Sequence, residues 1–214
     1  MNAPSETWWT GLLDVPPDAD VDDPAVGAVR VSDTDLPSLR GTDRPLSVVV
    51  TGGAGQLAGP AAYCGRTGLT LSGLTVTLRD LDDLTGNARR VVAAVDAARA
   101  EGSLDEDTPV YVELPQQEPS YGWLAAADEI AGAELRLGLR FAGTPAPTAT
   151  AWIEAALDRE ATFRATTAET AAIRSLLVAT VLAFDGAEPA DDTELARGRR
   201  WLVSVAATTV TGLR

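Results

Sequence analysis

The sequence predicts one α/β domain of TIM-barrel-like architecture, lean or incomplete, with about seven parallel strands and helices outside them. Two observations lead to this prediction. β-rich runs alternate with helical patterns along the chain, and the strand-like runs carry one apolar and one polar face. The length of 214 residues suits a single core, and no internal repeat or low-complexity linker divides it. We therefore assign residues 1–214 to one domain.

Short β-rich runs and helical patterns follow one another through most of the chain. The β-rich runs lie at 28–32, 46–51, 74–79, 109–114, 135–141, 161–166 and 201–206. The helical patterns lie at 84–101, 120–131, 148–158 and 168–184. Such alternation is typical of a parallel sheet. Residues 1–26 contain Pro16, Pro17 and several aspartates, which predict an irregular N-terminal arm.

The two parities of the predicted strands differ in polarity. In the fifth of these runs one parity is leucine throughout, whereas the other holds Arg136 and Arg140. In the fourth run one parity is valine, whereas the other holds Tyr111 and Glu113. The central strands of an open sheet with helices on both faces are apolar on both parities. A closed barrel with a polar interior therefore fits better, and a sheet with one face in solvent is the alternative.

The composition excludes several kinds of chemistry. All 17 basic residues are arginines, and the chain has no lysine and no histidine. Ser-His-Asp and Cys-His nucleophile pairs, lysine Schiff bases and histidine metal ligands are therefore excluded. The net charge of −14 argues against binding to nucleic acid or to an anionic membrane surface. Cys64, in a predicted loop, is expected to be an inert thiol, and the absence of a recognisable signal peptide or apolar span predicts a cytoplasmic protein.

A glycine-rich run at 48–59 resembles the dinucleotide-binding turn of short-chain dehydrogenases and sugar-nucleotide epimerases. That turn opens a helix, but Gly59 and Pro60 predict a broken helix here. The family's catalytic tyrosine also works beside a lysine, which this chain lacks. We therefore expect the protein to bind no nicotinamide, flavin or other cofactor. The alternative is that this turn is functional and that the protein binds NAD(P) as short-chain dehydrogenases do. In a milder interpretation, the loop at 51–59 closes over the barrel mouth and offers backbone amides to an anion.

Five segments together resemble an uncharacterised family of actinobacterial α/β-barrel-like proteins. They are residues 8–14, 45–50, 110–115, 139–143 and 163–168. Members of that family usually carry a lysine at the position of Arg164 and a His-His pair at the positions of Thr170 and Ala171. The resemblance therefore implies a paralogue whose chemistry was re-purposed or lost, such as a tailoring enzyme of natural-product biosynthesis.

The predicted strand ends bring arginines and carboxylates together, and in parallel barrels these ends carry the active site. We expect Glu113 or Asp33 to act as the catalytic general base. The expected substrate-binding residues are Arg79, Tyr111, Arg136, Arg140, Arg164 and Thr166. Guanidinium groups match carboxylate, phosphate and sulfate, so we expect a small anionic substrate, free or attached to a carrier protein, and no metal ion. An internal lattice of salt bridges that only fills the barrel is the alternative.

These residue types favour one class of reaction. Arginines can stabilise an oxyanion leaving group, and a neighbouring carboxylate can remove a proton, which together suit elimination or intramolecular cyclisation. In antibiotic biosynthesis one such reaction is loss of a sulfate ester with closure of an aziridine, as in azinomycin-type assembly. The sequence thus predicts a lyase or cyclase without a metal or redox cofactor. A non-catalytic binding module or partner subunit is the rival class, and a homo-oligomer is compatible with either.

Overall fold

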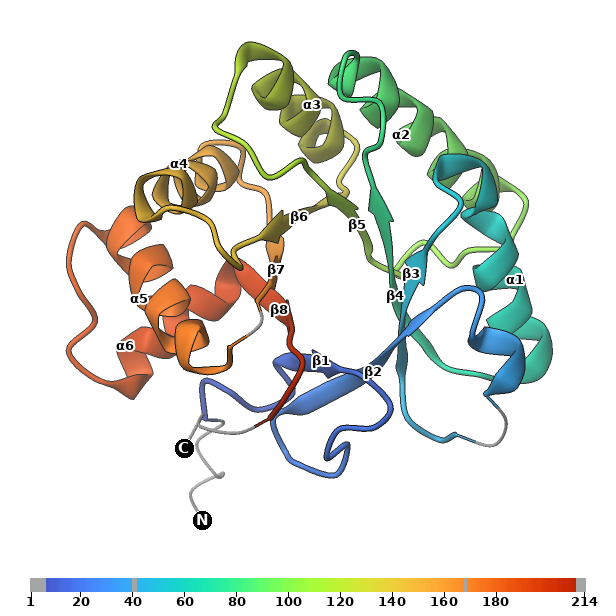
Figure 1. The fold of residues 1–214 in the computed structure, drawn as a ribbon, viewed down its shortest axis with the longest axis horizontal. Helices are drawn as coiled ribbons and strands as arrows, with labels where there is room; N and C mark the ends of the chain where they lie inside the picture. The colour runs from blue at the N-terminus through green and yellow to red at the C-terminus, as the bar shows by residue number, and fades with distance from the viewer. Residues whose placement is uncertain (1–6, 40–41, 168, 211–214) are drawn as a thin grey trace.

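Eight parallel strands close into a complete barrel in the computed structural model, which describes residues 7–39, 42–167 and 169–210 (Figure 1). The strands are β1 (Leu13–Val15), β2 (Val26–Ser32), β3 (Leu46–Val50), β4 (Leu71–Thr77), β5 (Val110–Glu113), β6 (Arg136–Arg140), β7 (Phe163–Thr166) and β8 (Leu202–Ala206). Each strand pairs with its neighbours in sequence order, and β8 pairs with β1 to close the ring. The expected TIM-barrel-like fold is confirmed, with eight strands in place of about seven.

Helices lie outside the barrel and follow most of the strands. They are α1 (Ala58–Thr67), α2 (Leu84–Ala100), α3 (Tyr121–Gly132), α4 (Ala146–Leu157), α5 (Ala171–Asp185) and α6 (Asp192–Ala196), together with the 3₁₀ segments η1 (Leu36–Ser38), η2 (Ala54–Gln56) and η3 (Arg197–Arg200). The helical patterns of the sequence are confirmed as α2 to α5, although residue 168 itself lies outside the described ranges. In the described residues no α-helix separates β1 from β2 or β2 from β3, and Figure 1 shows loops on that side of the barrel. None of the helices described has both the length and the apolar character of a membrane span.

The first strand lies inside residues 1–26, so the expectation of an irregular arm is wrong there. Three residues are too few to show an alternating pattern. β1 is instead held by hydrogen bonds on both sides. Leu13 N–H donates to the Ala25 carbonyl, and Val205 N–H in β8 donates to the carbonyl just before β1. These tertiary hydrogen bonds define the strand, while residues 1–6 of the expected arm lie outside the described residues.

Helix α1 is continuous, although Gly59, Pro60 and Gly65 predict a broken one. Pro60 occupies the first turn, where a missing N–H removes no intrahelical hydrogen bond. The helix ends at Gly68, whose φ of +71° favours glycine. Cys64 is consequently buried in a helix and not placed in a loop. The glycine-rich turn therefore does open a helix, as in dinucleotide-binding proteins, but it does so in a closed barrel and not in an open sheet.

The apolar parity of the strands packs against the helices. Leu135, Leu137 and Leu139 are all buried, as the alternation of β6 predicts. In the helical layer Trp123 of α3 and Trp152 of α4 stack with their ring centroids 6.4 Å apart. Burial of one large apolar side chain contributes roughly 1.5–3 kcal/mol, so this layer is a major source of stability. The polar parity is left to fill the barrel interior.

Candidate functional site

Four side chains from alternate strands form one layer across the middle of the barrel. Asp14 comes from β1, Ser47 from β3, Tyr111 from β5 and Arg164 from β7. Arg164 Nη2 donates to the Asp14 carboxylate and, at 2.7 Å, to Ser47 Oγ. Arg164 Cζ lies 4.1 Å from the centre of the Tyr111 ring, which is a cation–π contact. Layers of four residues from alternate strands are the usual way in which TIM-type barrels fill their interior.

The hydrogen-bonding capacity of Arg164 is largely used inside the protein. Its Nη1 donates to Thr75 Oγ1 at 2.6 Å, and its Nε donates to Ser204 Oγ at 3.3 Å. The side chains of Arg164 and Asp14 are only 3% and 8% exposed. Arg164 therefore connects β7 to β1, β3, β4 and β8. For this residue the structure agrees with the alternative interpretation, in which a lattice of internal salt bridges and hydrogen bonds fills the barrel.

An ion pair marks the carboxyl end of the barrel. Glu113 is the last residue of β5, Arg140 is the last residue of β6, and Arg140 Nη2 donates to Glu113 Oε1. The Glu113 side chain is only 5% exposed, whereas the Arg140 side chain is 50% exposed. Thr166, the last residue of β7, lies opposite Arg140 in the strand register. Glu113 is thus covered, while part of the Arg140 guanidinium remains accessible from the mouth.

Arg30, in the middle of β2, brings a further positive charge to the interior. Its Nε is buried and has no hydrogen-bond partner among the described residues. Burial and the positive charge of Arg164 lower the pKa of Arg30. The carboxylates of Glu113 and Asp14 act in the opposite direction, and Arg140 adds a smaller lowering. The Arg30 guanidinium thus interacts electrostatically with charges of both the central layer and the ion pair at the mouth.

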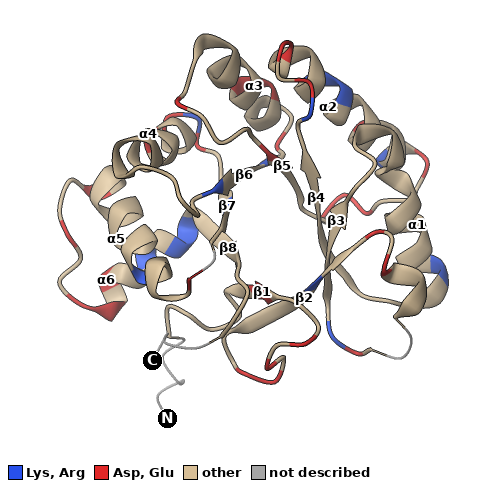
Figure 2. Ribbon diagram, viewed as in Figure 1, with Lys and Arg blue, Asp and Glu red and all other residues tan. Residues whose placement is uncertain are grey.

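Positive charge exceeds negative charge among these interior side chains. Arg136, at the amino end of β6, donates to the Tyr111 hydroxyl at 3.1 Å. Four arginines thus share the interior with the carboxylates Asp14 and Glu113: Arg30, Arg136, Arg140 and Arg164. Figure 2 shows charged positions on β1, β2, β5 and β6 around the barrel. Asp14 pairs with Arg164 and Glu113 pairs with Arg140, whereas Arg30 and Arg136 form no ion pair within the described part of the chain.

Asp33 and Arg79 belong to a different network at the rim of the barrel. The Asp33 carboxylate accepts hydrogen bonds from Thr51 N–H at 3.0 Å and from Thr51 Oγ1 at 2.7 Å. Arg79 donates to the Thr51 carbonyl. Since these residues follow β2, β3 and β4, their contacts link three loops at the carboxyl ends of the strands. Of the two expected bases, Glu113 is therefore the one that contacts an interior arginine.

Sequence reasoning misses Asp14 and Arg30. Asp14 lies in the three-residue strand within the expected arm, and nothing local identifies it as the partner of Arg164. Arg30 lies in a β-rich run between Val29 and Val31, which are both buried. The same alternation of apolar and polar residues identifies Arg140, so the sequence could have predicted that the Arg30 side chain points into the barrel. It could not have predicted that Arg30 has no carboxylate partner among the described residues.

The fold and the interior together define a TIM-type α/β barrel lined by arginines and carboxylates. Within the described ranges no three His, Cys, Asp or Glu side chains cluster so as to hold a metal ion. The chain matches no protein-family model and no curated protein sequence. The function is therefore inferred from the side chains of the barrel itself.

Proposed function

We propose that the protein binds a small anionic molecule at the carboxyl end of its barrel and acts on it there. Arg30 carries this proposal, because its guanidinium lies inside the barrel with no carboxylate partner among the described residues. Arg30 is partly buried, and its Nε is buried without a hydrogen-bond partner among the described residues; a bound anion would offset the cost of this desolvation. Arg140 supplies a second, half-exposed guanidinium. Two such groups suit a carboxylate, a phosphate or a sulfate ester.

Glu113 supplies the proton acceptor beside that anion. Its Oε1 accepts from Arg140, and its Oε2 makes no hydrogen bond with a described residue. In the proposed reaction Glu113 removes a proton from an amine or an activated carbon, and the freed electron pair forms an N–C or C=C bond. The C–O bond to a sulfate or phosphate breaks as the new bond forms, and the sulfate or phosphate leaves with the electron pair of that C–O bond. Arg30 and Arg140 stabilise the departing oxyanion.

This chemistry makes the protein a lyase or a cyclase. Aziridine closure with loss of sulfate, the step of antibiotic assembly named above, is one case of this class. Elimination of phosphate is another. Both follow from the same arrangement of one covered carboxylate and two arginines, and the substrate is free or attached to a carrier protein.

Isothermal titration with inorganic sulfate and phosphate tests the binding step. Arg30→Gln should weaken binding about 10- to 100-fold, because a charge-assisted hydrogen bond contributes roughly 1.5–3 kcal/mol. Arg89→Gln is the matched control, since Arg89 pairs with Glu129 on the surface and its side chain is 66% exposed. We expect this control to bind like the unmodified protein. Equal affinity in Arg30→Gln and Arg89→Gln contradicts the proposal.

A simple amino sulfate tests the chemical step. Ring closure of 2-aminoethyl sulfate gives aziridine and sulfate, and ion chromatography measures the sulfate released. Glu113→Gln keeps the shape of the side chain but cannot accept the proton, so sulfate release should be lost while sulfate binding persists. Binding of sulfate without release from this compound, and without phosphate release from O-phosphoserine, favours the non-catalytic binding module.

A further inference from the structure

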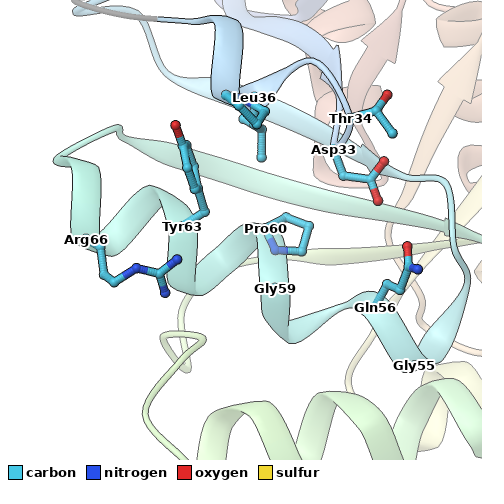
Figure 3. A pocket seen from close by; sticks show the side chains of 10 residues that line it. Asp33, Thr34, Leu36, Gly55, Gln56, Gly59, Pro60, Tyr63 and Arg66 are labelled. Atoms are coloured by element: carbon cyan, nitrogen blue, oxygen red, sulfur yellow. The ribbon is translucent and has the colours of Figure 1, made fainter.

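A groove of about 500 Å³ lies between η1 and α1, outside the barrel wall (Figure 3). Its lining includes Leu36 on one side and Gly59, Pro60 and Tyr63 of α1 on the other. Among the described residues the connection from β2 to β3 supplies η1 and no α-helix, so this side of α1 is left uncovered. The volume lies within the range of small-molecule sites, roughly 300–1,000 Å³.

The two ends of the groove differ in charge. Figure 3 shows Tyr63 and Arg66 of α1 toward one end, and Asp33 with Gln56 toward the other. Arg66 makes no hydrogen bond or ion pair with any residue that the structure describes. Asp33, by contrast, is held by its two hydrogen bonds to Thr51. A ligand with one anionic group is therefore attracted to the Arg66 end and repelled from the Asp33 end.

The wall formed by α1 presents a ring and a cation on one face. Gly59 and Tyr63 are four residues apart and Tyr63 and Arg66 are three apart, so all three share that face. The partly exposed ring of Tyr63 offers flat apolar surface, while Pro60 and Leu36 are buried at the base of the groove. Aromatic rings in contact stabilise each other beyond the burial of their area, so a planar ring suits this wall.

Gly59 keeps this face of α1 open. A Cβ at this position would meet no atom within 4 Å, and its φ lies outside the left-handed range. Neither packing nor backbone conformation requires glycine here, although a helix with glycine in its interior is less stable than one with alanine. The missing side chain widens the groove beside Tyr63.

We propose that this groove is a second small-molecule site, which takes a planar apolar ring carrying one anionic group. The ring packs against Tyr63 above the buried Leu36, and the anionic group binds the exposed Arg66. The groove reaches the rim of the barrel at Asp33, but its lining includes none of Arg30, Glu113 and Arg140, the residues proposed to act at the mouth. Its occupancy therefore does not depend on the function proposed for the mouth.

Indole-3-acetate is the probe, since it is a planar ring with one carboxylate, and indole-3-ethanol is its uncharged counterpart. We expect isothermal titration to show one saturable site for indole-3-acetate, with a Kd below about 1 mM. Arg66→Gln should weaken binding of indole-3-acetate about tenfold, because it removes the charge-assisted contact, and should leave indole-3-ethanol unaffected.

Gly59→Leu tests the position of the ring. The added side chain projects into the groove and should weaken binding of both probes at least about tenfold. Gly122→Leu in α3 is the matched control, since a Cβ there also meets nothing within 4 Å and Gly122 does not line the groove. Circular dichroism verifies that each variant is folded. The proposal is overturned if indole-3-acetate shows no saturable binding up to about 5 mM, if Gly59→Leu binds like Gly122→Leu, or if Arg66→Gln weakens both probes equally.

Discussion

Asp14→Asn removes the negative charge beside Arg164 and keeps the size of the side chain. Both partners are nearly fully buried, at 8% and 3% exposure, so solvent cannot compensate the remaining guanidinium. Breaking a buried ion pair by removing one partner costs about 3–5 kcal/mol. For a domain of this size each 1 kcal/mol lowers the melting temperature by roughly 2–4 °C. We therefore expect a decrease of about 6–20 °C, a large part of a stability of about 5–15 kcal/mol.

Urea unfolding followed by circular dichroism measures this free energy directly. Arg89→Gln, which breaks the exposed pair with Glu129, is the control and should cost less than about 1 kcal/mol. The double variant Asp14→Leu/Arg164→Met removes both charges of the pair together and should recover much of the loss, because neither member of this pair is left buried without the other. A cost for Asp14→Asn as small as that of the control would refute the description of Arg164 as the centre of a buried network.

Three further predictions concern packing, burial and geometry. Gly138→Ala should lower the free energy of unfolding in urea by about 1–3 kcal/mol, because the new Cβ would lie 2.9 Å from Glu113 Cα. Gly65→Ala, with open space around the new Cβ, should instead raise it by about 0.4–1 kcal/mol. Equal stabilities of the two variants would contradict this prediction. Cys64 should react with Ellman's reagent much more slowly in the native protein than in urea, because the thiol is buried and burial raises its pKa, and rapid native labelling would show that it is accessible. Arg164→Lys should lower the melting temperature, since one ammonium group cannot reach all the acceptors that the guanidinium reaches; an unchanged value would mean that charge alone matters there.

Much of the barrel follows from local periodicity. Successive side chains of a strand point to opposite faces, so the sequence separates Leu137 and Leu139 from Arg136 and Arg140 without any knowledge of long-range contacts. Helices α2 to α5 follow in the same way from apolar residues spaced three and four apart. α1 is the exception, because Pro60 is harmful only inside a helix and its place in the first turn was not evident from composition.

Other features depend on contacts between distant segments. β1 is too short for any pattern and exists because strands on both sides hydrogen-bond to it. It brings Asp14 to Arg164, 150 residues away in the sequence. The sequence alone determined that Tyr111, Glu113 and several arginines face a common interior. Only the closed barrel decided that Arg164 is satisfied, that Arg30 has no carboxylate partner among the described residues, and that Asp33 bonds at the rim. The physical reason is that ion pairs and hydrogen bonds act over a few ångströms, and the closure and register of the strands determine which side chains come within that distance.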